Sequence, residues 1–284
     1  MSRIGIWFDG GGRFGFGNIC RSCEMGRELA GRGHEVTMVA LSSKAESISS
    51  CPVGAPGRAD VVLLDVPYPG DKEVRLAHHF GAKVVALDYE GGEKPEAVVA
   101  LQGGRSMPTG TRRHVGIEYS IIRSELRAVR GAGSDSGEVL VILGGGDSDG
   151  LSNEVARRLP SVPLVIVQGP NGGILQIDRD NVRILDRPPE LPQLMSSCRW
   201  AVTSGGTTML EMLHLGKAVH VVPRTEAENK FAEHFLRKRA ILGIGIEDLV
   251  KPENSQKRLC EASGAKLIDG LGAERIANIM EDFL

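Results

Sequence analysis

A run of glycine and hydroxyl-bearing residues follows an apolar segment in the second half of the chain. It reads Ala201-Val-Thr-Ser-Gly-Gly-Thr-Thr-Met-Leu-Glu211. A buried strand that ends at Thr203 and turns through two glycines would begin a helix near Thr207. The first turn of a helix presents unpaired N–H groups and about half a positive charge. A phosphate or diphosphate fits such a helix start.

Side chains around this turn extend the predicted site. Glu211 lies one helical turn beyond the two threonines, where it can accept hydrogen bonds from a ribose diol. The alternative is a tight turn with Glu211 in solvent, because glycine pairs are common between strands and helices. The predicted nucleotide-binding residues are Ser204, Gly205, Gly206, Thr207, Thr208 and Glu211.

Three further loops at predicted strand ends are small or polar, namely 144–146, 169–173 and 223–229. Parallel sheets bind ligands at the carboxyl ends of their strands. We therefore expect Gly145, Gly146 and Gly169 to contribute to the same nucleotide site.

The first half of the chain carries a second glycine-rich segment, residues 9–21, in which Gly17 and Arg21 are expected to contact the nucleotide-sugar. Asp9 follows the first predicted strand and Asp65 follows the third, so both lie where a ligand would bind. Each is a candidate general base, Asp9 ahead of Asp65. The alternative for each is an aspartate that caps a turn or helix.

Potential metal ligands do not form a complete set. Cys20 and Cys23 form one CxxC pair without a second pair or an HxxxH, whereas structural zinc needs about four ligands. We expect these cysteines to be buried helix residues. Asp147-Ser-Asp149 matches a DxD metal signature, but its place between a glycine turn and a helix favours capping. Neither a metal nor a cofactor is expected.

The composition points to a small-molecule partner. Aromatic residues make up 4% of the 284 residues and the net charge is −2, which argues against nucleic acid and anionic lipid. No apolar run reaches the ~18 residues of a membrane span, and Met1 leads into a predicted strand rather than a signal peptide. The five cysteines form no extracellular framework. A cytoplasmic location is expected.

These residues lie within a strand–glycine–helix–strand rhythm that restarts once along the chain. Apolar runs predict strands at 4–8, 36–41, 61–64, 84–87, 98–101, 139–143, 164–167, 182–185, 200–203 and 218–222. The rhythm indicates an α/β fold with two Rossmann-like domains, whose parallel sheets are flanked by helices and separated by a cleft. We expect domains at 1–132 and 133–270, and a C-terminal helix at 271–284 that packs back on the first.

The second-half motifs resemble the donor-nucleotide signature of GT-B sugar-nucleotide enzymes, including MurG-type N-acetylglucosaminyltransferases. The matching residues are 204–211, Gly216-Lys-Ala, Pro223 and Asn229. The resemblance implies that Glu211 holds the ribose hydroxyls and that Asn229 contacts the sugar.

Other segments are similar to the UDP-sugar hydrolases of pseudaminic acid biosynthesis and their spore-coat polysaccharide relatives. These are Gly116-Ile-Glu-Tyr-Ser-Ile-Ile-Arg-Ser-Glu125, Val139-Leu-Val-Ile-Leu-Gly-Gly-Gly-Asp147 and the layout of residues 9–21. That family carries Gly-x-Gly-His-x-x-Arg, but here Asn18 replaces the catalytic histidine. An amide cannot act as a general base and can only hydrogen-bond to a sugar, water or diphosphate.

The resemblance implies an enzyme of cell-surface glycan or nonulosonic acid biosynthesis that hydrolyses a UDP-sugar and releases UDP. Because the nucleoside diphosphate leaves as a stabilised anion, a helix dipole and donors can replace a general acid. A GT-B glycosyltransferase is the first alternative. The second is a non-catalytic sugar-nucleotide binder, because Asn18 stands in place of the histidine.

Overall fold

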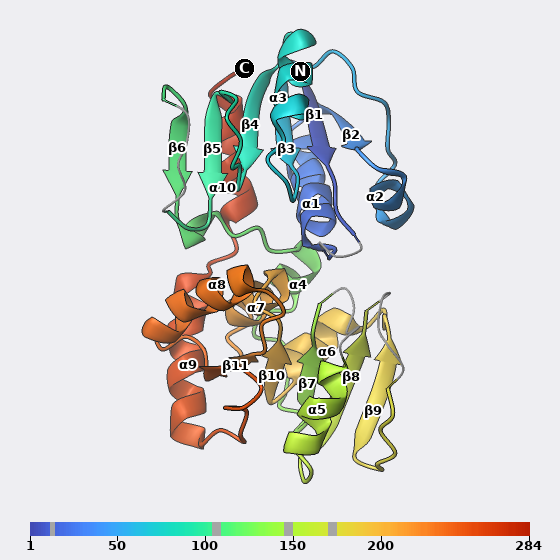
Figure 1. Cartoon of the computed structure of the whole chain (residues 1–284), viewed down its shortest axis with the longest axis vertical. Helices are drawn as coiled ribbons and strands as arrows, with labels where there is room; N and C mark the ends of the chain where they lie inside the picture. Colours follow the sequence, from blue (N-terminus) through green and yellow to red (C-terminus); the bar gives the residue numbers. More distant parts are fainter. Residues whose placement is uncertain (12–14, 104–108, 145–149, 170–174) are drawn as a thin grey trace. The chain divides into compact units, whose positions relative to one another are not determined.

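The computed structural model describes residues 1–11, 15–103, 109–144, 150–169 and 175–284. The chain divides into two compact units (Figure 1). Unit 1 consists of Met1–Arg123 together with Gly270–Leu284, and unit 2 of Ser124–Asp269. Gly145 and Gly146, and the Asp147-Ser-Asp149 motif, lie outside the described residues. Among the described helices, none is both long enough and apolar enough to cross a membrane.

Unit 1 is built on one parallel six-stranded sheet. Its strands are β1 (Arg3–Phe8), β2 (Glu35–Ala40), β3 (Val61–Asp65), β4 (Lys83–Leu87), β5 (Ala97–Ala100) and β6 (Arg112–Val115). Its helices are α1 (Gly17–Gly31), α2 (Ser43–Ile48), α3 (Asp71–His79), the 3-10 helix η2 (Ile117–Tyr119) and α10 (Gly272–Glu281).

The central strands β1, β3, β4 and β5 are buried on both faces, which explains their largely apolar sequences. On β1, Ile6 and Phe8 pack into one core cluster whereas Trp7 packs into the cluster on the opposite face. The strand order is β2-β1-β3-β4-β5-β6. The order reverses between β1 and β3, and open α/β sheets bind ligands at such a switch point.

Unit 2 repeats the arrangement with a second parallel sheet. Its strands are β7 (Val139–Ile142), β8 (Leu164–Gln168), β9 (Val182–Asp186), β10 (Trp200–Thr203), β11 (Val219–Val221) and β12 (Gly243–Ile244). Its helices are α4 (Ser124–Ala128), α5 (Leu151–Arg158), α6 (Leu191–Ser197), α7 (Thr207–His214), α8 (Glu226–Arg237) and α9 (Asn254–Leu267). The order β12-β11-β10-β7-β8-β9 places the reversal between β7 and β10.

The predicted fold class is confirmed, because both units contain a parallel sheet flanked by helices (Figure 1). Two edge strands escaped the sequence prediction. β6 reads Arg-Arg-His-Val and is largely exposed, and β12 has only two residues. Neither offers the apolar run by which a buried strand is recognised.

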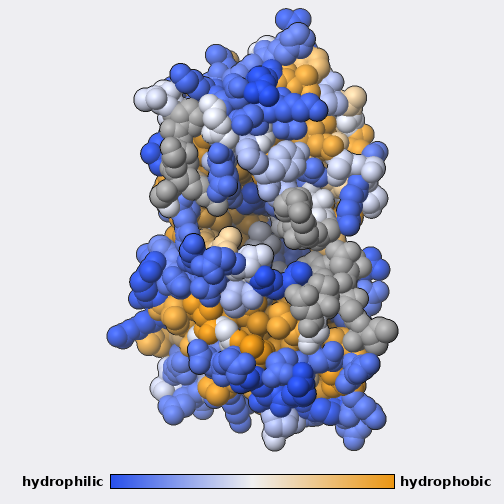
Figure 2. All heavy atoms as spheres, in the orientation of Figure 1, coloured by the Kyte–Doolittle hydropathy of each residue, from blue (hydrophilic) through white to orange (hydrophobic). Residues whose placement is uncertain are grey.

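The face shown in Figure 2 is mostly hydrophilic, with apolar patches between the polar side chains. The exposed large apolar residues of unit 2 include Leu236, Val250 and Leu259. Of the two cysteines in the CxxC pair, Cys23 is buried but Cys20 is exposed, so the expected burial is wrong for Cys20.

The C-terminal helix α10 completes the core of unit 1. Ile276, Ala277 and Met280 join the same buried cluster as Met25 and Leu29 of α1. An ionic contact reinforces this packing, because Glu281 accepts hydrogen bonds from Arg32 at 2.8 Å and contacts His34 at 3.0 Å.

These partners of Glu281 make a pH-dependent contribution to stability. The His34 hydrogen bond and the Arg32 charge outweigh partial burial and lower the pKa of Glu281. A lowered folded-state pKa stabilises the fold at neutral pH, and the effect is lost as the pH falls below the ordinary glutamate value of about 4.3.

We therefore expect Glu281→Gln to lower the free energy of unfolding of unit 1 by about 1 kcal/mol or less at pH 7, because the contact is partly exposed. Urea titrations at several pH values should show the deficit shrinking below pH ~4. Glu274→Gln, on the same helix, is the control because Arg32 contacts only the Glu274 backbone carbonyl. A deficit that is independent of pH would contradict the ionic explanation.

Candidate functional site

The loop between β10 and α7 forms an open helix start in unit 2. Residues 204–208, called the cradle below, run from the end of β10 into the first turn of α7. Gly206 is the N-cap residue, and no described side chain caps this helix, whereas Thr225 caps α8. The half-buried Gly206, Thr207 and Thr208 therefore offer backbone N–H groups that no side chain among the described residues caps.

The cradle lies at the switch point of the unit 2 sheet. β7 and β10 are neighbouring strands, and Gly144 follows β7 at the same edge as Ser204. A Cβ atom on Gly144 would lie 3.3 Å from Ser204 Oγ, and Gly144 has a φ of +82°. Glycine thus allows the two loops to approach closely where ligands of such sheets bind.

The two glycines of the cradle have different environments. A Cβ atom on Gly205 would lie only 2.6 Å from the Glu228 carbonyl oxygen, so Gly205 is required for packing against α8. At Gly206 the nearest atoms to such a Cβ are 4.0 Å away. Gly206, rather than Gly205, leaves space that a ligand can occupy.

Glu211 lies on α7, one turn beyond Thr207. Its side chain is buried, with 5% of the residue exposed. The solvent-exposed alternative for Glu211 is therefore wrong. A buried carboxylate is found where it has polar partners, which fits a group at the base of a ligand site.

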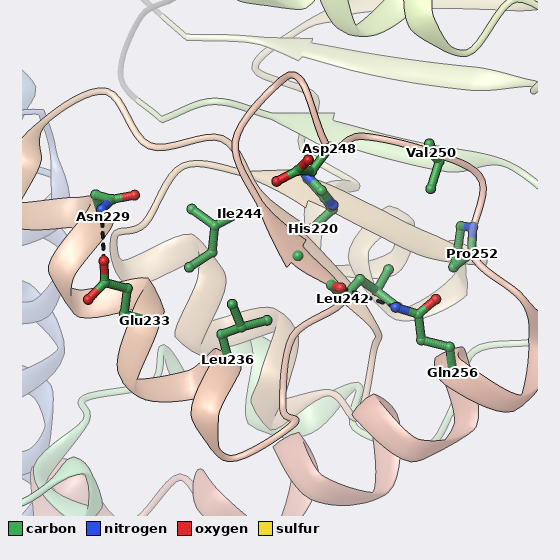
Figure 3. A pocket seen from close by; sticks show the side chains of 11 residues that line it. His220, Asn229, Glu233, Leu236, Leu242, Ile244, Asp248, Val250, Pro252 and Gln256 are labelled. Carbon is green, nitrogen blue, oxygen red and sulfur yellow. Dashed lines mark hydrogen bonds between the residues drawn. The ribbon is translucent and has the colours of Figure 1, made fainter.

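The remaining predicted residues of unit 2 are placed differently. Gly169 follows β8 at the carboxyl edge of the sheet and is half-buried. Asn229 points along α8, where its amide donates to Glu233 at 3.2 Å (Figure 3). Asn229 and Glu233 line a pocket of about 500 Å³ between α8, β12 and the segment after β12. None of the cradle residues 204–208 lines this pocket.

In unit 1, Asp65 forms the centre of a polar network at the end of β3. Arg21 donates to its two carboxylate oxygens at 2.6 and 2.8 Å, and Asn18 donates from Nδ2 at 2.7 Å. Ser22 adds a hydrogen bond from Oγ at 3.0 Å. Asp65 is 0% exposed. A general base needs a lone pair that water can reach. Because Asp65 is buried and its carboxylate is hydrogen-bonded, it does not fit the expected role of a proton acceptor.

Arg21 is held between two carboxylates. Its Nη1 atom donates to Asp88 at 3.0 Å while Nε and Nη2 bind Asp65. Burial lowers the pKa of Arg21, but the charges and hydrogen bonds of Asp65 and Asp88 outweigh it and raise that pKa. Two negative charges thus balance the guanidinium, which weakens the expected contact of Arg21 with a phosphate.

Asp9 is half-buried at the end of β1, beside Asp65 across the switch point. The Asp9 N–H donates to the Asp65 carbonyl oxygen at 3.2 Å. Its carboxylate accepts hydrogen bonds from Gly10 N at 2.8 Å and Ser42 Oγ at 2.6 Å. Burial, the nearby Glu73 charge and the contact with Asp9 raise the pKa of Tyr68.

Ser22, Ser42 and Tyr68 were not predicted as parts of this site. Ser42 follows β2 at the carboxyl edge of the sheet, and this position in the sequence could have identified it as a site residue. Gly17 begins α1, so the predicted residues Gly17, Asn18 and Arg21 share its first turns. Across the described residues, no group of three or more histidine, cysteine or acidic side chains is placed to hold a metal ion.

No known family model matches the chain. The spore coat polysaccharide biosynthesis protein SpsG of Bacillus subtilis (strain 168) is 23% identical over 261 residues, which cover 79% of this chain and 77% of that protein.

Solved structures agree over nearly the whole chain. MurG of Acinetobacter baumannii superposes with a TM-score of 0.68 at 11% identity, covering 99% of this chain and 100% of MurG. The complex of S. aureus MnaA with UDP gives a TM-score of 0.63 at 10% identity, covering 100% and 97%. The chain has the GT-B fold. At these identities the GT-B likeness establishes the architecture of the two units.

The network in unit 1 predicts that removing the Asp65 carboxylate lowers the free energy of unfolding more than removing the Asp88 carboxylate. Asp65→Asn should lower the free energy of unfolding by about 3–5 kcal/mol, because it breaks a buried ion pair. Asp88→Asn should cost about 1 kcal/mol or less, since Asp88 has 31% of its side chain exposed. Urea denaturation of both variants measures the difference. Equal costs would contradict the central role of Asp65.

Proposed function

We propose that the protein is a nucleotide-sugar enzyme of glycan biosynthesis that hydrolyses the glycosyl–phosphate bond of a UDP-sugar and releases UDP. The observation that carries the proposal is the uncapped start of α7 at the switch point of the unit 2 sheet. A helix N-terminus there attracts a diphosphate through its free N–H groups and its dipole.

The similar proteins support this class of substrate. SpsG is described as a spore coat polysaccharide biosynthesis protein, and MnaA was solved with UDP. In unit 2, the proposed nucleotide site consists of the cradle, Glu211 and the neighbouring loops at the carboxyl edge. Glu211 accepts hydrogen bonds from the ribose hydroxyls, and the N–H groups of Thr207 and Thr208 bind the diphosphate.

In unit 1, we assign the proton transfer to Asp9. The oxygen of a water molecule attacks the anomeric carbon while the bond from that carbon to the phosphate oxygen breaks. The Asp9 carboxylate takes the water proton, and UDP leaves with the bonding electron pair. Asp65 is a positioning residue in this scheme, because it holds Asn18 and Arg21 by hydrogen bonds.

The Asn18 amide also offers an acceptor. Its Nδ2 group donates to the Asp65 carboxylate, and this hydrogen bond fixes which end of the amide carries the nitrogen. The Oδ1 atom is then available to accept a hydrogen bond from a water or a sugar hydroxyl.

A glycosyltransferase is the second candidate. The same fold occurs in MurG and in the calicheamicin glycosyltransferase CalG4, which superposes with a TM-score of 0.63. A transferase would pass the sugar to an acceptor hydroxyl in place of water. Asn18 also favours a third candidate, a sugar-nucleotide binder without turnover, because its amide cannot accept a proton.

These candidates differ in what releases the nucleotide. We expect the protein to release UDP from one or more of a panel of UDP-sugars in water alone. Chromatography of the nucleotide and NMR of the sugar measure this release. Release only with an added acceptor would assign a transferase. Binding without release would assign the silent binder, and no binding at millimolar concentration would overturn the proposal.

A Glu211 variant links any release to the cradle. Glu211→Ala should weaken UDP binding tenfold or more, because charge-assisted hydrogen bonds to two hydroxyls are lost. Glu233→Ala is the matched control, since Glu233 lines the separate pocket beside α8. Equal affinities of Glu211→Ala and the wild type would remove Glu211 from the site.

The position of Asn18 predicts a gain of activity. A histidine at residue 18 would place a ring N–H near Asp65 Oδ1, which lies 2.7 Å from Asn18 Nδ2. A histidine oriented by a carboxylate is an effective base near neutral pH, and general acid–base groups contribute about 10²–10⁴-fold. We expect Asn18→His to raise the hydrolysis rate tenfold or more at pH 7.

The pH profile provides the control for this variant. A new acidic limb, in which the rate rises with pH through the ordinary histidine pKa of about 6.5, should appear only in Asn18→His. Asn18→Gln retains an amide and should show no such limb. An unchanged rate for Asn18→His would mean that the site works around a different base.

A further inference from the structure

Arg224 reaches the cradle from the 223–229 loop, but the sequence motifs did not single out this residue. It follows Pro223 between β11 and α8, and it is half-buried. Its Nη1 atom lies 4.0 Å from the point where a Cβ of Gly144 would stand, and Ser204 Oγ lies 3.3 Å from the same point. The guanidinium and the hydroxyl thus converge on one glycine at the switch point.

The backbone of Arg224 is fixed to α8. Glu228 accepts a hydrogen bond from the Arg224 N–H at 2.6 Å, and the Thr225 hydroxyl accepts one from Glu228 N at 3.1 Å. This reciprocal arrangement resembles a capping box, which sets the entry of a chain into a helix. Glu228 in turn packs against Gly205. The cradle and the backbone of Arg224 are therefore both in contact with one residue, Glu228.

A negative charge lies beside the cradle, so a cation there would favour the binding of a diphosphate. The Glu228 Oε1 atom lies 4.0 Å from the Cβ position of Gly206, so a negative charge adjoins the cradle. Arg158 and Arg183 of unit 2 pair with carboxylates, whereas no described carboxylate forms an ion pair with Arg224. The Arg224 guanidinium therefore supplies a positive charge close to Gly144 and Ser204.

We infer that Arg224 binds the diphosphate of the nucleotide together with the cradle amides. The assignment rests on the proposed function and adds to it the residue that supplies positive charge. Arginine suits this role because its planar fork can donate two parallel hydrogen bonds to phosphate oxygens. The contact would favour a nucleoside diphosphate over the corresponding nucleoside.

Comparison of UDP with uridine tests this assignment. Arg224→Gln should weaken UDP binding about tenfold or more, because a charge-assisted hydrogen bond is lost. Uridine has no phosphate, so its affinity should change less than about twofold. Arg224→Lys keeps the charge without the fork and should give an intermediate loss. NMR titration of the full-length protein measures both ligands over the millimolar range.

Arg157→Gln provides a matched control for the loss of one positive charge. Arg157 lies in the last turn of α5, with 73% of its side chain exposed, and pairs with Glu154. This variant should bind UDP like the wild type, and thermal melting should show that both variants fold.

The outcomes separate the two levels of the proposal. Wild-type binding of UDP with an unchanged Arg224→Gln affinity, or equal losses for UDP and uridine, would overturn the assignment of Arg224 alone. A wild-type protein that binds no UDP would overturn the proposed function, and the assignment with it.

Discussion

The connectivity of parallel strands is the constraint on which the rest of this structure depends. Each strand must be followed by a crossover, so every loop that leaves a strand end lies at the same edge of its sheet. In both units the strand order reverses once, between β1 and β3 and between β7 and β10. Residues far apart in sequence therefore meet at two points, and the polar side chains of interest gather there.

The two switch points differ in the charged and polar groups that they contain. In unit 1, Asp65 and Asp88 both bind Arg21, and a third carboxylate, Asp9, follows the neighbouring strand β1. In unit 2, an uncapped helix start and Arg224 provide positive potential. This difference supports the proposal that unit 2 binds the phosphates and that unit 1 binds hydroxyl groups and water.

Much of this arrangement could be predicted from the sequence. Apolar runs followed by glycines identified the buried strands and their loops, because strands buried on both faces lack polar alternation. The edge strands β6 and β12 were missed because they are polar or very short. The open start of α7 followed from local sequence, since the turn and the absence of a capping side chain are properties of adjacent residues.

Roles that depend on distant partners could not be predicted in the same way. The position of Asp65 at a strand end was correctly inferred, but its enclosure depends on Arg21, which lies 44 residues away in sequence. Likewise, Asn229 follows the expected motif, yet its orientation depends on Glu233, one turn along α8. The close approach of Gly205 to Glu228 also required coordinates.

The return of α10 has a consequence for how the protein is made. Unit 1 contains both ends of the chain, and Ile276, Ala277 and Met280 fill a core whose other walls are synthesised first. During translation, unit 2 therefore has its whole sequence available before unit 1 does. Until α10 has been synthesised, it cannot cover the apolar side of α1, so the nascent chain exposes an apolar surface that favours aggregation or chaperone binding.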